Sequence, residues 1–199
     1  MEINIEIIEA FKKTINKESS DRAKVIITVA QIEYLLDMKL KEQFSGGNSN
    51  VRKKLFSENG AFSTFSSKVD IAYCSGWIDS DVFHDIEILR KIRNIFAHSF
   101  EALSLDSSDI KKLIEKFQVP HREYYDWGKL KIASLDNGIV MYTGDKPDRA
   151  KEELEVPGRL FFVIGMSILY AVLLENLRFK VKFSDGKIID ITLPNHMKN

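Results

Sequence analysis

The residues best suited to chemistry lie close together in the middle of the chain. Arg93, Asn94 and His98 form the run Arg-Asn-x-x-x-His. Histidine takes up and releases a proton near neutral pH, and the planar guanidinium of arginine matches the oxygens of a phosphate. Asn94 stands one helical turn before His98, where its amide can orient the imidazole or hydrogen-bond a substrate. Proton transfer at a phosphate ester is therefore the chemistry that these three residue types suit.

This run lies at the end of a predicted helix over residues 80–98. Apolar residues recur at helical spacing along one side, and Asp79 or Ser80 can cap its start. The apolar stripe consists of Val82, Ile86, Leu89, Ile92 and Phe96. At about 100° per residue, one polar face collects His84, Glu87, Lys91, Asn94 and His98. The helix end at His98 and Ser99 is therefore expected to be open to solvent and to a substrate.

Arg93 takes a different direction on the same helix. It points about 140° away from His98, toward the side that is expected to face the core. That side otherwise carries Val82, Ile86 and Ala97. An arginine on an apolar side needs a carboxylate or an anionic ligand, and Asp70 and Glu33 are the expected partners within the chain. A purely structural role is the alternative, with Arg93 in a buried ion pair and His98 as a cation at a helix end.

The polar face also raises the question of a metal site. His84 and Glu87 lie on the same face as His98. A single helix face with mixed ligands and no ligand from another element is usually solvated surface. We therefore expect neither a metal nor a cofactor.

The run resembles the signature of the HEPN superfamily, in which an arginine is followed after four to six residues by a histidine. Arg93, Asn94 and His98 fill these positions without a gap. A longer stretch, over residues 50–100, is similar to the mannitol-operon repressor-like family of bacterial proteins. The residues that carry this similarity are Leu55-Phe56, Gly60 to Lys68, Ala72-Tyr73, Gly76 to Ile78, Asp85 and Arg90 to Asn94. Ala61 departs from that pattern, which has proline there, and the predicted hairpins after residue 127 belong to neither pattern.

The HEPN resemblance implies an endoribonuclease that needs no metal, uses the ribose 2′-hydroxyl as nucleophile and leaves a 2′,3′-cyclic phosphate. The residues implied as catalytic are Arg93, Asn94 and His98, and those expected to bind RNA are Arg90, Lys91 and Ser99. Because Arg93 and His98 diverge on the helix, we expect a homodimer that brings two helix ends together. Such an enzyme would act as a toxin or a phage-defence effector.

The second resemblance implies a non-catalytic transcriptional regulator that works through contacts with a protein partner. The sequence contains no helix-turn-helix with a basic recognition helix, which weakens direct DNA binding. It also lacks a glycine-rich phosphate loop and a Walker lysine. Both functions stay open at this point. The intact Arg-Asn-x-x-x-His run favours the ribonuclease slightly, since a regulator has no physical need for it.

The composition is that of a globular protein without a charge bias. The 199 residues include 29 Lys+Arg and 29 Asp+Glu, so any contact with nucleic acid has to come from a local patch. Cys74 is the only cysteine, which excludes an internal disulfide and fits a reducing compartment. The longest apolar run, over 160–174, has 15 residues, fewer than the about 20 that cross a bilayer. We therefore expect a cytoplasmic protein without membrane contact.

The hydrophobic pattern predicts a mainly α fold, an HEPN-like antiparallel helical bundle with two small C-terminal β-hairpins. Helices are expected over about 3–16, 21–44, 51–58, 62–75, 80–98, 110–117 and 157–178. The hairpins are expected at Asn137-Gly138 and Asp185-Gly186, which are turn sequences. Residues 1–126 then form the helical bundle with the motif. Residues 127–199 form a hairpin-helix-hairpin appendage packed on the same domain.

Overall fold

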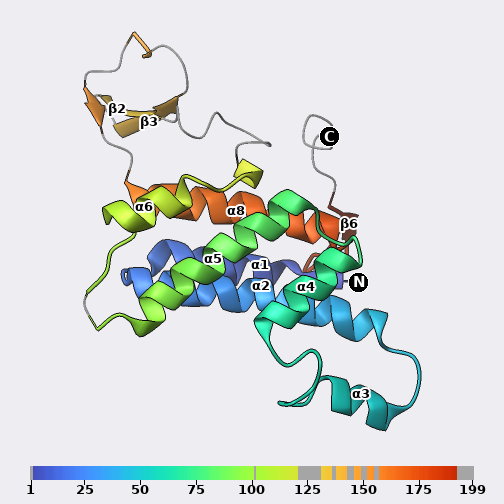
Figure 1. The fold of residues 1–199 in the computed structure, drawn as a ribbon. Helices are drawn as coiled ribbons and strands as arrows, with labels where there is room; N and C mark the ends of the chain where they lie inside the picture. The colour runs from blue at the N-terminus through green and yellow to red at the C-terminus, as the bar shows by residue number, and fades with distance from the viewer. Residues whose placement is uncertain are drawn as a thin grey trace.

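Seven α-helices and two three-stranded sheets are present in the part of the chain that the structure describes (Figure 1). The computed structural model describes residues 2–100, 102–120, 131–135, 138–142, 146–148, 152–154 and 157–191. The helices are α1 (Ile5–Lys17), α2 (Asp21–Gln43), α3 (Ser49–Leu55), α4 (Phe65–Cys74), α5 (Ser80–His98), α6 (Ser108–Ile114) and α8 (Gly158–Asn176). The predicted mainly α class is confirmed.

The most apolar helix, α8, lies inside the helical bundle. It contacts α1, α2, α5 and α6, and Phe162, Leu169 and Leu173 on it are fully buried. By length and composition alone α8 could cross a membrane. Its side chains instead fill the core between the other helices, so its apolar character is that of a core helix.

Both predicted hairpins are present, and each gains a third strand. The first pairs β2 (Lys131–Leu135) with β3 (Gly138–Tyr142), and β4 (Glu153–Leu154) joins β2 on its other edge. The second pairs β5 (Lys180–Lys182) with β6 (Ile188–Asp190), and β1 (Glu2–Asn4) joins β5 in parallel. The expected turn residue Asn137 lies outside the described residues. The two sheets lie at different ends of the bundle (Figure 1).

The prediction that the first helix begins near Ile3 is wrong. Ile3 lies in β1, is 1% exposed and pairs with Val181 of β5. The helix starts only at Ile5. Ile3 keeps the helical spacing of the following apolar residues, but a partner strand far along the chain decides its conformation, and local periodicity does not reveal such a partner.

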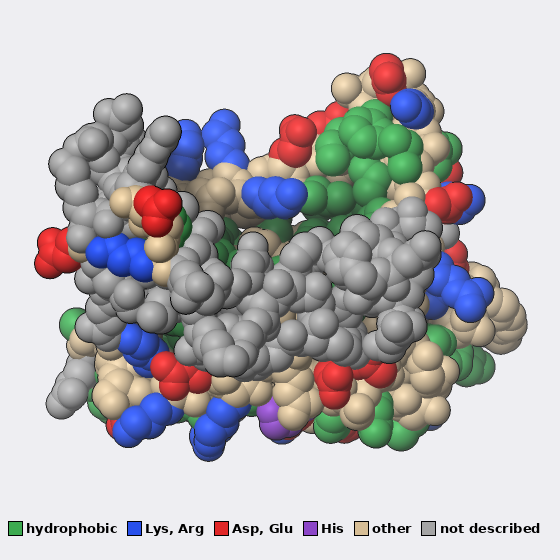
Figure 2. All heavy atoms as spheres, turned by 90° about the horizontal axis from the view of Figure 1, so that it is seen from above, with side chains coloured by type: hydrophobic (Ala, Val, Ile, Leu, Met, Phe, Trp, Pro, Cys, Tyr) green, Lys and Arg blue, Asp and Glu red, His purple; other side chains and the backbone are tan. Residues whose placement is uncertain are grey.

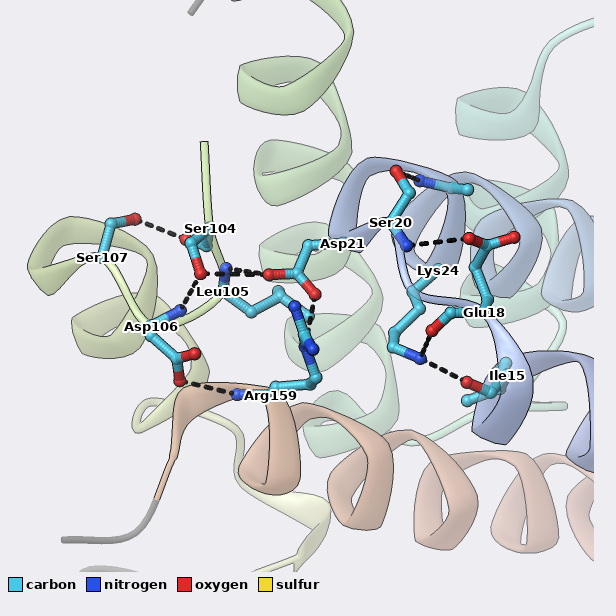
Figure 3. Close-up of polar contacts among 11 residues, drawn as sticks. Ile15, Glu18, Ser20, Asp21, Lys24, Ser104, Leu105, Asp106, Ser107 and Arg159 are labelled. Atoms are coloured by element: carbon cyan, nitrogen blue, oxygen red, sulfur yellow. Dashed lines mark hydrogen bonds and ion pairs between the residues drawn. The ribbon is translucent and has the colours of Figure 1, made fainter. Parts of the chain in front are cut away.

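A buried carboxylate joins three segments at one end of the bundle (Figure 3). Asp21 at the start of α2 accepts hydrogen bonds from Arg159 Nε at 2.7 Å, Leu105 N–H at 2.9 Å and the Ser104 hydroxyl at 3.1 Å. Arg159 belongs to the first turn of α8, while Ser104 and Leu105 precede α6. A Cβ at Gly158 would lie 2.1 Å from the Leu105 carbonyl oxygen, so only glycine lets α8 approach this segment.

The ionised form of Asp21 stabilises the fold. Burial by itself raises the pKa of this carboxyl group, but hydrogen bonds from Arg159, Leu105 and Ser104 outweigh burial and hold the pKa below its ordinary value. Because the folded-state pKa lies below the unfolded-state pKa, the contribution is complete above about pH 4. It is lost as the pH falls through the folded-state pKa.

A second buried carboxylate anchors the chain just after α6. Asp85 of α5 is 0% exposed and accepts hydrogen bonds from Gln118 N–H at 2.7 Å and Val119 N–H at 2.9 Å. A helix as short as α6 is not stable in isolation, so tertiary contacts have to hold it in place. Asp21 supplies such a contact before α6 and Asp85 supplies one after it.

We expect Asp21→Asn to lower the free energy of unfolding by about 2 kcal/mol at neutral pH, because a neutral amide cannot replace the charge that three donors stabilise. The estimate is modest because the Arg159 side chain is 47% exposed and solvent screens its charge. The difference from wild type should shrink toward about pH 3. Urea unfolding at both pH values measures it. Asp109→Asn is the control, because the Asp109 side chain is 95% exposed. If Asp21→Asn were as stable as the wild type at neutral pH, the expectation would be contradicted.

Asp85→Ala should loosen the segment after α6, because it leaves the part-buried N–H of Gln118 and the buried N–H of Val119 without their acceptor. We expect a loss of about 3 kcal/mol in the free energy of unfolding and faster hydrogen exchange at the amides of Gln118 and Val119. Exchange measured by NMR reports both amides directly. Asp70→Asn, at an exposed position of α4, serves as the matched control. Unchanged protection of the two amides in Asp85→Ala would show that other contacts hold the segment.

Candidate functional site

The candidate site is built on α5, whose start and orientation follow from its sequence. The Asp79 carboxylate caps the helix by accepting hydrogen bonds from Asp81 N–H at 3.1 Å and Val82 N–H at 2.9 Å. The predicted stripe is buried in the bundle, and its members are Val82, Ile86, Leu89, Ile92 and Phe96. The helix ends at His98, with Ser99 as its C-cap. The polar face of α5 therefore points away from the core.

Arg93, Asn94 and His98 are all exposed on the last turns of α5. The Arg93 guanidinium donates a hydrogen bond to Asn94 Oδ1 at 3.0 Å. The prediction that Arg93 lies on the core side of the helix is wrong. On that flank α4 covers only the first part of α5. Tyr73, near the end of α4, stacks on Phe83 near the start of α5, and Ser66, near the start of α4, lies beside Arg90. Arg93 lies beyond the start of α4 and is left in solvent.

Neither of the expected partners of Arg93 is paired with it. Glu33 on α2 accepts a hydrogen bond from Lys68 Nζ at 2.9 Å, and Asp37 lies 3.3 Å from the same ammonium group. Burial lowers the pKa of Lys68, but the two carboxylates outweigh it and raise the pKa above its ordinary value. Asp70 is exposed, and neither Asp70 nor Glu33 forms an ion pair with Arg93. The predicted ion pair of Arg93 with Asp70 or Glu33 is therefore not formed within the chain.

An open groove of about 790 Å³ lies between α5 and the end of α6, and we call it the α5–α6 groove. The lining residues are His84, Glu87, Ile88, Arg90, Lys91, Asn94 and Ile95 from α5, with Leu113 and Lys116 from α6 and the turn after it. Four of the five residues predicted on the polar face of α5 line it. Arg90, Lys91 and Asn94 are thus brought together, whereas Arg93, His98 and Ser99 do not line the groove.

The rim of the α5–α6 groove is positively charged. Arg90 forms an ion pair with Glu87 at 2.5 Å and donates a hydrogen bond to the Ser66 hydroxyl at 2.9 Å. Lys91 and Lys116 are exposed and form no ion pair with any residue that the structure describes. Among the described residues on the face seen in Figure 2, Lys and Arg side chains alternate with Asp and Glu side chains. The positive rim is therefore a local feature of a neutral chain.

The floor of the α5–α6 groove is apolar and fixed. Ile88 is 8% exposed, while Ile95 and Leu113 are partly buried and pack against the core. The chain after α6 is tied to α5 through Asp85 and the backbone of Gln118. Because both walls rest on the packed bundle, the groove exists without a ligand to form it.

Sequence reasoning missed Leu113 and Lys116. The apolar period of α6 predicted a helix with a buried side, but nothing in it says which helix that side contacts.

The end of α5 has a second neighbour that the sequence did not indicate. The Arg22 guanidinium of α2 donates a hydrogen bond to the Ser99 carbonyl oxygen at 2.7 Å. The role predicted for Ser99 in substrate binding is not tested by this contact.

The geometry of His98 limits the chemistry that one chain offers. Its imidazole forms no hydrogen bond or ion pair with another described residue. A general acid or base is normally oriented by a partner group. Among the described residues, no group of three or more His, Cys, Asp or Glu side chains could hold a metal ion. What the arrangement offers is a positively charged groove with an apolar floor.

The fold has a counterpart among solved structures. No family model matches the chain, and no curated protein matches it by sequence. The structure is similar, with a TM-score of 0.59, to a chain in the X-ray structure of the MtlR–HPr complex from Escherichia coli. The sequence identity is 14%, and the match covers 83% of this chain and 96% of the other. The predicted likeness to mannitol-operon repressor proteins is confirmed at the level of the fold, which is MtlR-like.

Proposed function

We propose that this chain is a non-catalytic regulator that works in the cytoplasm by binding a protein partner. The observation that carries the proposal is the similarity over 96% of a chain that was crystallised as a complex with a second protein, HPr. HPr, or a protein like it, is the first candidate for the partner. The absence of an orienting group on the His98 imidazole among the described residues also favours a role without catalysis.

A metal-independent endoribonuclease is the second candidate. Arg93, Asn94 and His98 are exposed near one helix end, so a second copy of the chain or an RNA strand can reach them. Arg93 and His98 point about 140° apart on α5, so a complete site would need two helix ends in a homodimer. In that case the dimer, and not the single chain, is the unit that acts on RNA.

Purified HPr should bind the wild-type chain with a dissociation constant in about the micromolar range, which is typical of a transient regulatory contact. Isothermal titration calorimetry measures the affinity and the stoichiometry. An unrelated small protein of similar charge, titrated under the same conditions, is the control for non-specific association. Absence of heat and of co-migration on size exclusion at about 100 µM would remove HPr as the partner.

We expect wild type, His98→Ala and Arg93→Ala to leave mixed RNA intact in the presence of EDTA, because no described residue of one chain orients the His98 imidazole for proton transfer. End analysis for 2′,3′-cyclic phosphates measures the reaction. Analytical ultracentrifugation of the same samples reports whether the dimer is present. Chelator-resistant cleavage by the wild type that is lost in both variants would replace the regulator with the ribonuclease.

A further inference from the structure

We propose that the α5–α6 groove binds an acidic segment of a protein partner. In this arrangement an apolar side chain of the segment lies on the groove floor, and carboxylates on either side of it meet the rim lysines. The inference rests on the regulatory function proposed above and adds to it the place and the chemistry of the contact.

The charge of the groove selects a carboxylate-bearing ligand. Lys91 comes from α5 and Lys116 from the turn after α6, so positive charge lies on both walls. Neither ammonium group is paired with a described residue, whereas the one carboxylate of the lining, Glu87, already pairs with Arg90. An incoming carboxylate can therefore pair with Lys91 and Lys116 without displacing a partner among the described residues. Complementary charge of this kind favours encounter and sets orientation.

The floor of the groove favours a protein over a nucleic acid. Ile88, Ile95 and Leu113 contribute aliphatic surface to the same lining as the two lysines. Aliphatic surface contributes to binding when it is covered by another apolar side chain. A nucleic-acid strand would instead use aromatic rings for stacking, and the residues that line the groove include no Phe, Tyr or Trp and a single imidazole, that of His84. A segment with both carboxylates and an aliphatic side chain uses the rim and the floor together.

The length of the groove fits a short helix. Its α5 residues extend from His84 to Ile95. At 1.5 Å per residue this stretch is about 16 Å long, which matches about three turns of a helix laid alongside it. The walls are held by the bundle and by the contact from Asp85 to the chain after α6. A preformed groove does not have to be ordered on binding, which reduces the cost of association.

The probe for this inference is a fluorescent helical peptide of about 12 residues, with leucines on one face and glutamates flanking them. Fluorescence anisotropy measures its binding to the intact chain and to Lys91→Glu, Lys116→Glu and the double variant. We expect binding to weaken by about five-fold for each single change and about 25-fold for both. Lys12→Glu, at an exposed lysine of α1 away from the groove, should bind as the wild type does. Circular dichroism verifies that each variant is folded.

Two further ligands separate the classes of partner. A peptide with glutamine in place of every glutamate should bind more weakly than the glutamate peptide, and so should a single-stranded RNA of equal negative charge. Equal binding of the glutamate peptide by wild type and double variant would overturn the inference. Failure of the glutamate peptide to bind, or tighter binding of the glutamine peptide or the RNA, would overturn it as well.

The same samples distinguish this inference from the proposed function. HPr is titrated against the wild type in parallel with the peptides. Binding of HPr without binding of the glutamate peptide would keep the regulator and overturn the acidic-segment site. Lysine-dependent binding of the peptide without binding of HPr would support the site and remove HPr as the partner.

Discussion

Two buried carboxylates hold the short helix α6 at both of its ends. Asp21 accepts the N–H of Leu105 before the helix, and Asp85 accepts the N–H groups of Gln118 and Val119 after it. In each case fixed donors replace the water that a carboxylate loses on burial, so the charge is stabilised inside the protein. The α5–α6 groove depends on these contacts, because α6 and the turn after it form its second wall. Polar interactions in the interior thus determine the shape of the surface.

The features that the sequence predicted are those set by local physics. The apolar stripe and the Asp79 cap define α5, and both are encoded within one helix. The turn sequences around Gly138 and Gly186 each join two adjacent strands, which is again a local event. The polar face of α5 was also predicted, and most of it lines the groove. A helical period is enough to state which residues share a face.

The features that the sequence did not predict depend on distant neighbours. Ile3 has helical spacing but lies in a strand because Val181 is beside it. Arg93 lies toward the apolar stripe by angle alone, yet it is exposed because α4 does not extend that far along α5. The contact of Asp21 with Arg159 joins residues at the starts of two helices far apart in the chain. Periodicity gives the direction of a side chain from its helix but not what covers it.

Exposure has different consequences for the two functions that the motif suggested. A catalytic histidine needs a partner that orients it and a site that excludes water, and the exposed His98 has no such partner among the described residues. A binding surface needs fixed walls, available charge and some apolar area, and the α5–α6 groove has fixed walls, an apolar floor and two lysines without an ion pair among the described residues. The chain is neutral overall, and charges in solution are screened within about 8–10 Å. In the proposed contact, attraction to the partner therefore has to come from local groups such as Lys91 and Lys116, which lie on or beside the same polar face of α5 that resembles an active site in the sequence.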